Sequence, residues 1–191
     1  ATKIYPNSKG LEVFLTDVVK VSSNKLKVLG SGSSNGVDTG YFNPSPALRE
    51  SSEIFKTEHG LNDCFVFTYI GRIVRDKGIE ELLDAYQRLS SEVKNVRLLI
   101  VGLEEPLIDP ISNHAQLILK NNTGIVSTGF MDDIRPSLGA SDCLILASYR
   151  EGFPNVVMQA ACVNIPSIVS NINGCKEIIQ DGSNGLIVEP K

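Results

Sequence analysis

Apolar residues follow two alternating patterns along most of the chain. Short continuous apolar runs, which are typical of strands buried on both faces of a sheet, alternate with segments in which apolar residues recur every three or four positions, as on one face of a helix. The runs predict strands near residues 64–70, 96–102, 124–128, 142–147, 166–170 and 185–188. The periodic segments predict helices near 79–89, 111–120, 132–139, 154–163 and 175–180. Because strand and helix alternate without interruption, we predict an α/β fold: a Rossmann-like parallel sheet with helices on both faces.

The first sixty residues have a different character, because they are polar and rich in loop-forming residues. Gly and Asn recur in residues 30–36, where they favour backbone with positive φ and therefore a loop. A helix is predicted from about Ser45 to His59. The chain starts at Ala1 without an initiator methionine and close to an extended run, so we expect it to be a piece of a longer protein.

Composition narrows the classes of partner. The net charge is −4 without a basic block, which argues against nucleic acid, because binding to a phosphate backbone needs clustered Lys and Arg. The four cysteines have no Cys-x-x-Cys spacing and the two histidines are far apart, so no metal site is expected. Cysteines in apolar runs are typical of a reducing compartment, and we expect a cytoplasmic protein.

Ligands of open α/β sheets bind beyond the carboxyl ends of the strands, so the loops that follow the strands are the ones to inspect. The loop at residues 71–78 has three cations and is flanked by Gly71 and Gly78. Arg72 and Lys77 are placed to clamp a diphosphate through charge-assisted hydrogen bonds. A solvated charged loop is an equally weighted alternative.

A second such loop is Ser148-Tyr149-Arg150-Glu151-Gly152-Phe153-Pro154-Asn155. Pro154 suits the first turn of a helix, and the free amides of Gly152, Phe153 and Asn155 would form an anion site there. Glu151 would repel an anion unless it points past it to hydroxyl groups. A nucleotide sugar has both phosphates and hydroxyls. The alternative is that Glu151 only favours the helix dipole.

Four further positions have weaker signals. Asn155 and Gln159 are four residues apart, so they share a helix face and could pair with ribose or sugar hydroxyls, or be ordinary surface residues. Met131 could pack against a base or belong to the core. Asp132 is predicted to cap the helix that follows it.

In this order the loops resemble those of the retaining glycosyltransferases of GT-B architecture, a large family that includes mannosyl-, glucosyl- and capsular-polysaccharide transferases. The matching segments are GRIVRDKG (71–78), IVG (100–102), GFMDDI (129–134), EGFPNV (151–156), NGCKEII (173–179) and DGSNGLIV (181–188), and SNGVD (34–38) matches the family's linker region. The resemblance covers nearly the whole chain. It implies that the chain is the C-terminal, donor-binding domain of a GT-B fold.

The resemblance also implies residue roles. Arg72 and Lys77 look like the pair that binds the donor diphosphate, and Met131 and Asp133 stand where the family contacts the nucleobase. Glu151 matches the first carboxylate of the family's paired-Glu motif, which holds the donor sugar. The second Glu, which holds the ribose hydroxyls, is replaced here by Gln159. Gln can both accept and donate a hydrogen bond. On these grounds Glu151, Arg72 and Lys77 are the expected catalytic residues.

The implied organisation and activity follow from the same resemblance. Residues 1–60 would be the linker region and the start of the donor-binding domain, residues 61–191 the nucleotide-sugar-binding domain, and the N-terminal acceptor-binding domain would lie outside this chain. The whole enzyme would transfer a sugar, with retention and without a metal or other cofactor, from a nucleotide-diphosphate sugar to a glycan or lipid-linked acceptor. We expect a role in cell-surface polysaccharide synthesis, at the cytoplasmic face of the membrane, with this chain inactive alone. The alternatives are a nucleotide-sugar epimerase of GT-B fold and a non-catalytic nucleotide-sugar-binding module.

Overall fold

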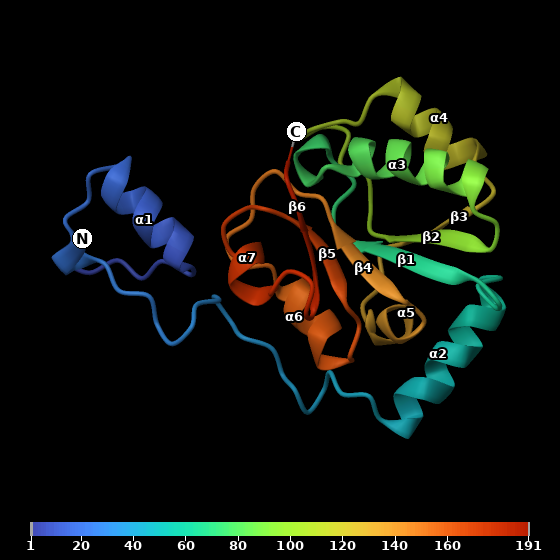
Figure 1. Ribbon diagram of the computed structural model, residues 1–191, viewed down its shortest axis with the longest axis horizontal. Coiled ribbons are helices and arrows are strands. Elements are labelled where there is room, and N and C mark those ends of the chain that lie inside the picture. Colours follow the sequence, from blue (N-terminus) through green and yellow to red (C-terminus); the bar gives the residue numbers. More distant parts are fainter. Residues whose placement is uncertain (1, 191) are drawn as a thin grey trace.

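The computed structural model describes residues 2–190 and is built around one six-stranded sheet of order β3-β2-β1-β4-β5-β6 (Figure 1). The elements are α1 Lys9–Asp17, α2 Pro46–Glu58, β1 Phe65–Ile70, α3 Ile79–Glu92, β2 Val96–Val101, α4 Asn113–Asn121, β3 Ile125–Gly129, α5 Arg135–Gly139, β4 Cys143–Leu146, α6 Asn155–Cys162, β5 Ser167–Ser170, α7 Cys175–Ile178 and β6 Gly185–Val188. Each pair of neighbouring strands is parallel, which confirms the predicted fold class.

The strand order reverses direction between β1 and β4. From β1 the chain runs outward through β2 to β3, then returns to add β4, β5 and β6 on the other side. The two central strands are joined at their start by Asp142, whose carboxylate accepts a hydrogen bond from Val66 N at 2.8 Å. A crevice opens at such a switch point, beyond the carboxyl ends of the strands, because the two connections leave in opposite directions.

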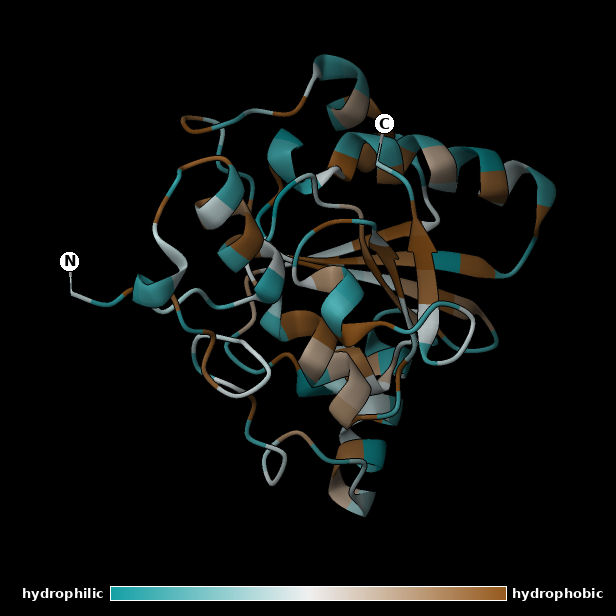
Figure 2. Cartoon of the chain, turned by 60° about the vertical axis from the view of Figure 1, so that its left-hand side comes forward, coloured by the Kyte–Doolittle hydropathy of each residue, from teal (hydrophilic) through white to brown (hydrophobic). Residues whose placement is uncertain are grey.

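Helices cover both faces of the sheet and bury its apolar side chains. On one face, α3 and α4 pack over β1 and β2 around Tyr69, Leu83 and Ile100. On the other face, α2 closes a cluster at Phe55, while α5, α6 and α7 pack over β4 and β5. Figure 2 shows the strands as mostly hydrophobic, whereas along a helix such as α3 hydrophilic and hydrophobic residues alternate.

Two predicted helix starts are corrected. The third sequence-predicted helix begins at Arg135, not at a cap on Asp132, and its N-cap residue Ile134 makes no side-chain capping bond. Pro136 explains the later start, because proline fits only the first turn of a helix. Similarly, Pro154 is extended and immediately precedes α6 rather than opening it. The predicted helix at Ser45 is confirmed as α2, which Ser45 caps.

Helix α1 was not predicted, because the first sixty residues were interpreted as loop-rich. Its N-cap is Ser8, whose hydroxyl accepts from Leu11 N at 3.1 Å, and no side chain of α1 is buried. Ile4 and Leu26 form a parallel bridge on either side of this helix, so the segment is a small β-α-β unit. In Figure 1 it lies to one side of the sheet. Within residues 2–190, no helix combines the length and apolarity needed to cross a membrane.

Candidate functional site

The switch point brings together the two loops that the sequence singled out. Lys77, from the loop after β1, places its Nζ atom 2.6 Å from Oε1 of Glu151, from the loop after β4. Each side chain is only 17% exposed. The hydroxyl of Ser148 donates to the same Oε1 atom at 2.8 Å, a contact that sequence analysis missed. A shielded cation and a hydroxyl therefore fix one oxygen of Glu151.

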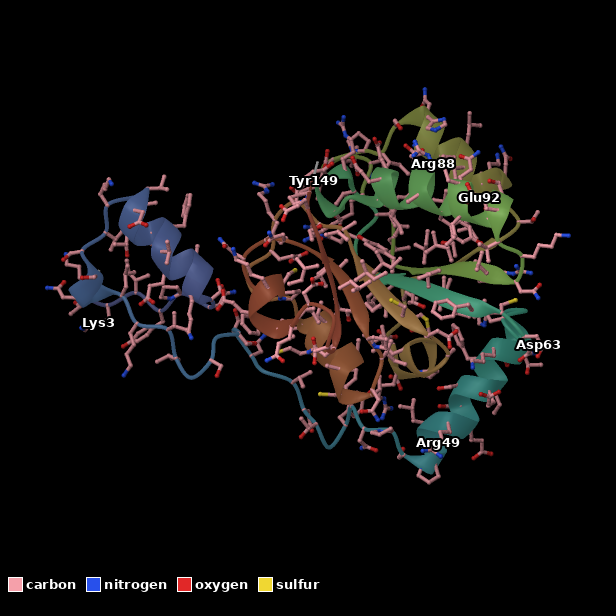
Figure 3. All side chains as sticks on the ribbon, viewed as in Figure 1. Lys3, Arg49, Asp63, Arg88, Glu92 and Tyr149 are labelled. Carbon is pink, nitrogen blue, oxygen red and sulfur yellow. The ribbon has the colours of Figure 1, made fainter. Side chains whose placement is uncertain are left out.

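The backbones of these two loops are in direct contact, which is why Lys77 and Glu151 meet. Gly78 has φ of +66°, and a Cβ atom there would collide with the carbonyl oxygen of Ala147. Tyr149 N donates to Asp76 O at 3.1 Å. The side chain of Tyr149, which Figure 3 labels near the start of α3, donates its hydroxyl to Glu81 of that helix at 2.6 Å.

A hydrogen bond from Tyr69 holds the backbone of Arg72 in place. The hydroxyl of this fully buried tyrosine donates to the carbonyl oxygen of Arg72 at 2.5 Å. Burial, and then the charge of Glu151, raise the pKa of Tyr69, so the phenol remains a protonated donor over the whole physiological range. The Arg72 guanidinium is half-exposed and pairs with Glu105 at 3.0 Å.

A cleft of about 320 Å³ adjoins Arg72. Its lining is mostly apolar and consists of Ile70, Gly71, Arg72, Val101, Gly102, Leu103, Glu105, Phe130, Met131 and Ile134. Met131 thus lies in the same cleft as Arg72. Two of the apolar lining residues, Leu103 and Phe130, are 57% and 67% exposed, so they offer apolar surface to a ligand. Sequence analysis did not select these two residues, although Phe130 directly follows β3 and Leu103 lies two residues after β2.

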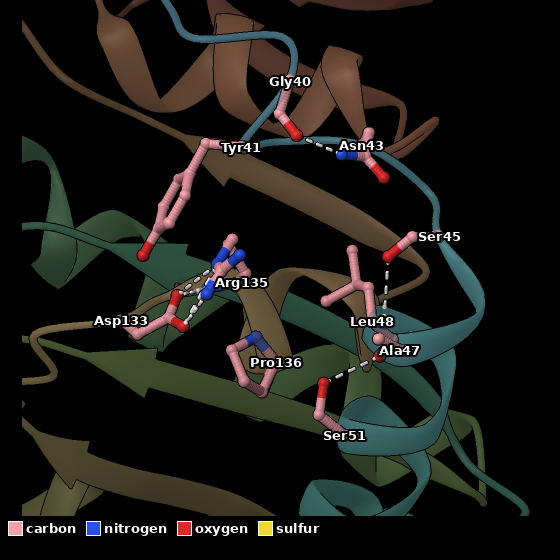
Figure 4. Close-up of a pocket in the computed structure, with 10 residues that line it drawn as sticks. All are labelled: Gly40, Tyr41, Asn43, Ser45, Ala47, Leu48, Ser51, Asp133, Arg135 and Pro136. Carbon is pink, nitrogen blue, oxygen red and sulfur yellow. Dashed lines mark hydrogen bonds and ion pairs between the residues drawn. The ribbon is translucent and has the colours of Figure 1, made fainter.

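Asp133 lies apart from this cleft. Its carboxylate makes a bidentate ion pair with Arg135, with Oδ2 2.6 Å from Nη2, and Arg135 is 3.7 Å from the ring centroid of Tyr41 (Figure 4). The hydrogen bonds from Arg135 hold the pKa of Asp133 below its ordinary value. Asp133 lines a second cleft, of about 360 Å³, between the 40–51 segment and α5. The structure therefore does not bring Asp133 and Met131 to one site.

Helix α6 places the remaining candidates. No side chain caps its first turn, and Val157 N donates to Pro154 O at 3.2 Å, so only the amides that precede Val157 stay available. Asn155 is exposed and Gln159 is partly buried one turn further along. In the loop before α6, Phe153 packs beside Gly32 and Gly152 packs beside Asn7. The N-terminal segment therefore contacts the loop that leads into α6. Asn7 carries no sequence signal that would have selected it.

The N-terminal segment also contacts α7 and the loop that precedes it. The carboxylate of Glu177 accepts hydrogen bonds from Lys9 N at 2.9 Å and Gly10 N at 3.0 Å, at the start of α1. Such a position suits a carboxylate because the helix dipole is positive there. A Cβ atom on Gly10 would collide with Asn173, so the two segments are closely packed. The β-α-β unit of residues 4–26 is therefore anchored by its helix N-terminus.

Among the described residues 2–190, no three His, Cys, Asp or Glu side chains are grouped as metal ligands. Cys175 is completely buried near Lys77 and Glu151, and burial raises the pKa of its thiol to about 12. A thiol of that pKa is not a nucleophile at neutral pH.

Residues 51–191 match the family described as glycosyl transferases group 1. The chain belongs to this family. CapM of Staphylococcus aureus, a capsular polysaccharide biosynthesis glycosyltransferase, is 33% identical over 190 residues, which cover 99% of this chain and 48% of CapM. A UDP-Gal:alpha-D-GlcNAc-diphosphoundecaprenol alpha-1,3-galactosyltransferase of Escherichia coli is 29% identical over 157 residues, 81% of this chain and 40% of that protein. The chain thus spans about half or less of these group 1 relatives.

Solved structures of the family share the fold. HepE of Anabaena, determined in complex with UDP and glucose, superposes with a TM-score of 0.83 at 20% identity, over 100% of this chain and 50% of HepE. The C-terminal domain of LpcC, a group 1 glycosyl transferase of Francisella tularensis, superposes with a TM-score of 0.69 at 25% identity, over 82% of this chain and 81% of that domain. The prediction that the chain has the fold of one half of a GT-B glycosyltransferase is confirmed.

Proposed function

We propose that this chain binds the nucleotide-diphosphate-sugar donor of a group 1 glycosyltransferase. The observation that carries the proposal is the shielded Lys77–Glu151 pair at the switch point of the sheet. Beside it stand a second cation, Arg72, and an apolar cleft of about 320 Å³. A ligand with a flat base, two phosphates and a sugar has a chemically suited partner for each part.

The diphosphate is assigned to Arg72, Lys77 and the start of α6. Both side chains donate charge-assisted hydrogen bonds, and the leading amides of α6 provide partial positive charge. As the glycosidic bond breaks, negative charge grows on the departing diphosphate, while the anomeric carbon gains oxocarbenium character. Cations already in position stabilise that charge at little reorganisation cost, so Arg72 and Lys77 act as catalytic groups in the complete enzyme.

The remaining parts of the donor are assigned by chemistry. Glu151 accepts hydrogen bonds from sugar hydroxyls, and Asn155 and Gln159, on one face of α6, bond ribose or sugar hydroxyls. The base lies in the cleft that Met131 and Phe130 line, where the exposed aromatic face of Phe130 offers stacking. Asp133 is assigned no contact with the donor, because its carboxylate pairs with Arg135 and lines the other cleft.

The complete protein would transfer the sugar with retention to a glycan or lipid-linked acceptor of cell-surface polysaccharide synthesis. The names of CapM and of the Escherichia coli transferase support this assignment. The acceptor is assigned to the half of the enzyme beyond this chain. The exposed apolar residues of α1, Val13 and Phe14, support a β-α-β unit that packs against further chain. We therefore expect the chain alone to bind donor without transferring sugar.

Titration calorimetry tests the proposal. UDP, GDP and ADP are titrated into the chain in buffer with EDTA, because no metal is required. We expect one of them to bind, with a loss of at least about tenfold for Arg72→Ala and for Lys77→Ala, since each removes a charge-assisted hydrogen bond. Arg88→Ala, on the exposed side of α3, is the matched control and should bind as the wild type does. Absence of binding for all three nucleotides would refute the proposal.

A further inference from the structure

The loop between β2 and α4 turns two of its side chains toward the loop that follows β1. Most of residues 103–110 are exposed, and Leu107 is 99% exposed. Glu105 and Asp109 are the partly buried exceptions. Each contacts an arginine of the neighbouring loop: Glu105 pairs with Arg72, and Asp109 pairs with Arg75. Two carboxylates therefore hold the loop against its neighbour, in addition to the backbone hydrogen bond from Ile73 N to Leu103 O at 2.9 Å.

These two carboxylates have different roles in that contact. Asp109 is an anchor, because its Oδ2 atom accepts from Asp76 N at 2.7 Å while Oδ1 accepts from Arg75 Nε at 3.3 Å. Glu105 makes a single contact, from Oε2 to Arg72 Nη1 at 3.0 Å. Its exposed fraction is 32%, and that of Arg72 is 53%. Solvent screens such a pair, so it separates easily.

In the absence of a ligand, each of the two cations that we assign to the phosphates pairs with a carboxylate. Lys77 is held by Glu151 and Arg72 by Glu105. Glu151 has an assigned role with the donor sugar, whereas Glu105 has none. Glu105 occupies one N–H of the Arg72 guanidinium and offsets its positive charge, so a phosphate that binds Arg72 must compete with this carboxylate.

We propose that Glu105 is an internal competitor that occupies Arg72 in place of a phosphate and weakens donor binding. This inference rests on the proposed function, because it requires Arg72 to contact the diphosphate. The donor displaces Glu105 from Arg72, and Asp109 keeps the loop attached while Glu105 turns away. Release of bound nucleotide is eased in the same way, since Glu105 recaptures Arg72. Glu105 thereby sets affinity without contacting the base or the ribose.

The test compares Glu105→Gln with Glu104→Gln, an exposed neighbour on the same loop. The probes are UDP, GDP, inorganic pyrophosphate and uridine, titrated calorimetrically into the 191-residue chain, with thermal unfolding as the check on folding. Glu105→Gln should bind the preferred nucleoside diphosphate and pyrophosphate about two- to fivefold more tightly, the range expected for removal of an exposed ion pair. Uridine affinity should not change. In an Arg72→Ala background, Glu105→Gln should have no effect, and Glu104→Gln should behave as the wild type throughout.

The possible outcomes distinguish a failure of this inference from a failure of the proposed function. A wild-type chain that binds nucleotide, together with a Glu105→Gln variant that binds it no more tightly, overturns this inference and leaves the proposed function standing. Weaker binding by Glu105→Gln also overturns it, because Glu105 would then contact the ligand. A tightening that survives in the Arg72→Ala background overturns it as well. Failure of the wild type to bind any nucleotide overturns both.

Discussion

Lys77 and Glu151 are 74 positions apart in the sequence, yet they form a 2.6 Å ion pair that is largely shielded from solvent. The pair joins the two loops on either side of the switch point. Removing one partner would leave the other charge poorly solvated, which is more costly than removing both. Because of this asymmetry, a double-mutant cycle can measure the interaction energy of the pair.

We expect Lys77→Met and Glu151→Gln each to reduce the free energy of unfolding by about 1–3 kcal/mol, less than for a fully buried pair because some solvent reaches both side chains. The double variant should lose less than the sum of the two. Urea denaturation of the four proteins gives the coupling energy. A coupling below about 0.5 kcal/mol would show that the pair is not formed in solution.

Gly78 should tolerate no side chain, because strain and collision combine there. With φ of +66° and the Ala147 carbonyl against its Cα, Gly78→Ala should destabilise the fold by about 3 kcal/mol or more. Gly182 has a similar φ of +73° and open space around it. Gly182→Ala should therefore cost only about 1 kcal/mol. Equal losses for the two variants in thermal or urea unfolding would contradict this account of the Gly78 contact.

Arg135 should control the titration of Asp133. The folded-state pKa of Asp133 is lowered, so its contribution to stability is present above the ordinary aspartate pKa, near 4, and is lost as the pH falls through the lowered value. Arg135→Met should raise the pKa of Asp133 toward its ordinary value and flatten the decline in stability below pH 4. Carboxyl NMR titration measures the first effect. An unchanged Asp133 titration in the variant would mean that the pair does not persist in solution.

Gln159 provides a test of the ribose assignment. Gln159→Ala should weaken UDP binding about three- to tenfold, the value of one hydrogen bond, and should leave 2′,3′-dideoxyuridine diphosphate unaffected. Gln159→Glu, which introduces the residue typical of the family motif, should bind UDP at least as tightly as the wild type. If Gln159→Ala weakens both nucleotides equally, its role is in folding of α6 and not in holding the hydroxyls.

The sequence was sufficient to predict the sheet and the convergence of the loops that contain Lys77 and Glu151, but not the ion pair between them. Buried parallel strands are continuous apolar runs, and their carboxyl ends share one edge, so the loops that follow neighbouring strands must converge. Helix α1 escaped prediction because its short apolar pattern lies in a polar region and none of its side chains is buried. The pattern of Leu11, Phe14 and Leu15 after the Ser8 cap was the available signal.

Side-chain direction was the part that sequence could not supply. Met131 and Asp133 are two residues apart, and motif resemblance placed both at the base. Whether each faces the cleft depends on the turn before α5, where Pro136 delays the helix and Arg135 captures Asp133. The Arg72–Glu105 contact likewise depends on the path of the 103–110 loop beside the loop after β1. The amino-acid sequence of a loop does not predict that path.

The reversal of strand order also has a consequence for the order of folding. Strand β1 pairs with β2 after about thirty residues of intervening chain, whereas its contact with β4 joins Val66 to Asp142, 76 positions away. Closing the longer loop costs more chain entropy and is slower. We therefore expect β1, β2 and β3 to form first and to serve as the template on which β4 docks. We expect the Lys77–Glu151 contact to form in that late docking step, so a nascent chain would bring together the two loops that we propose to bind phosphate only when the fold is nearly complete.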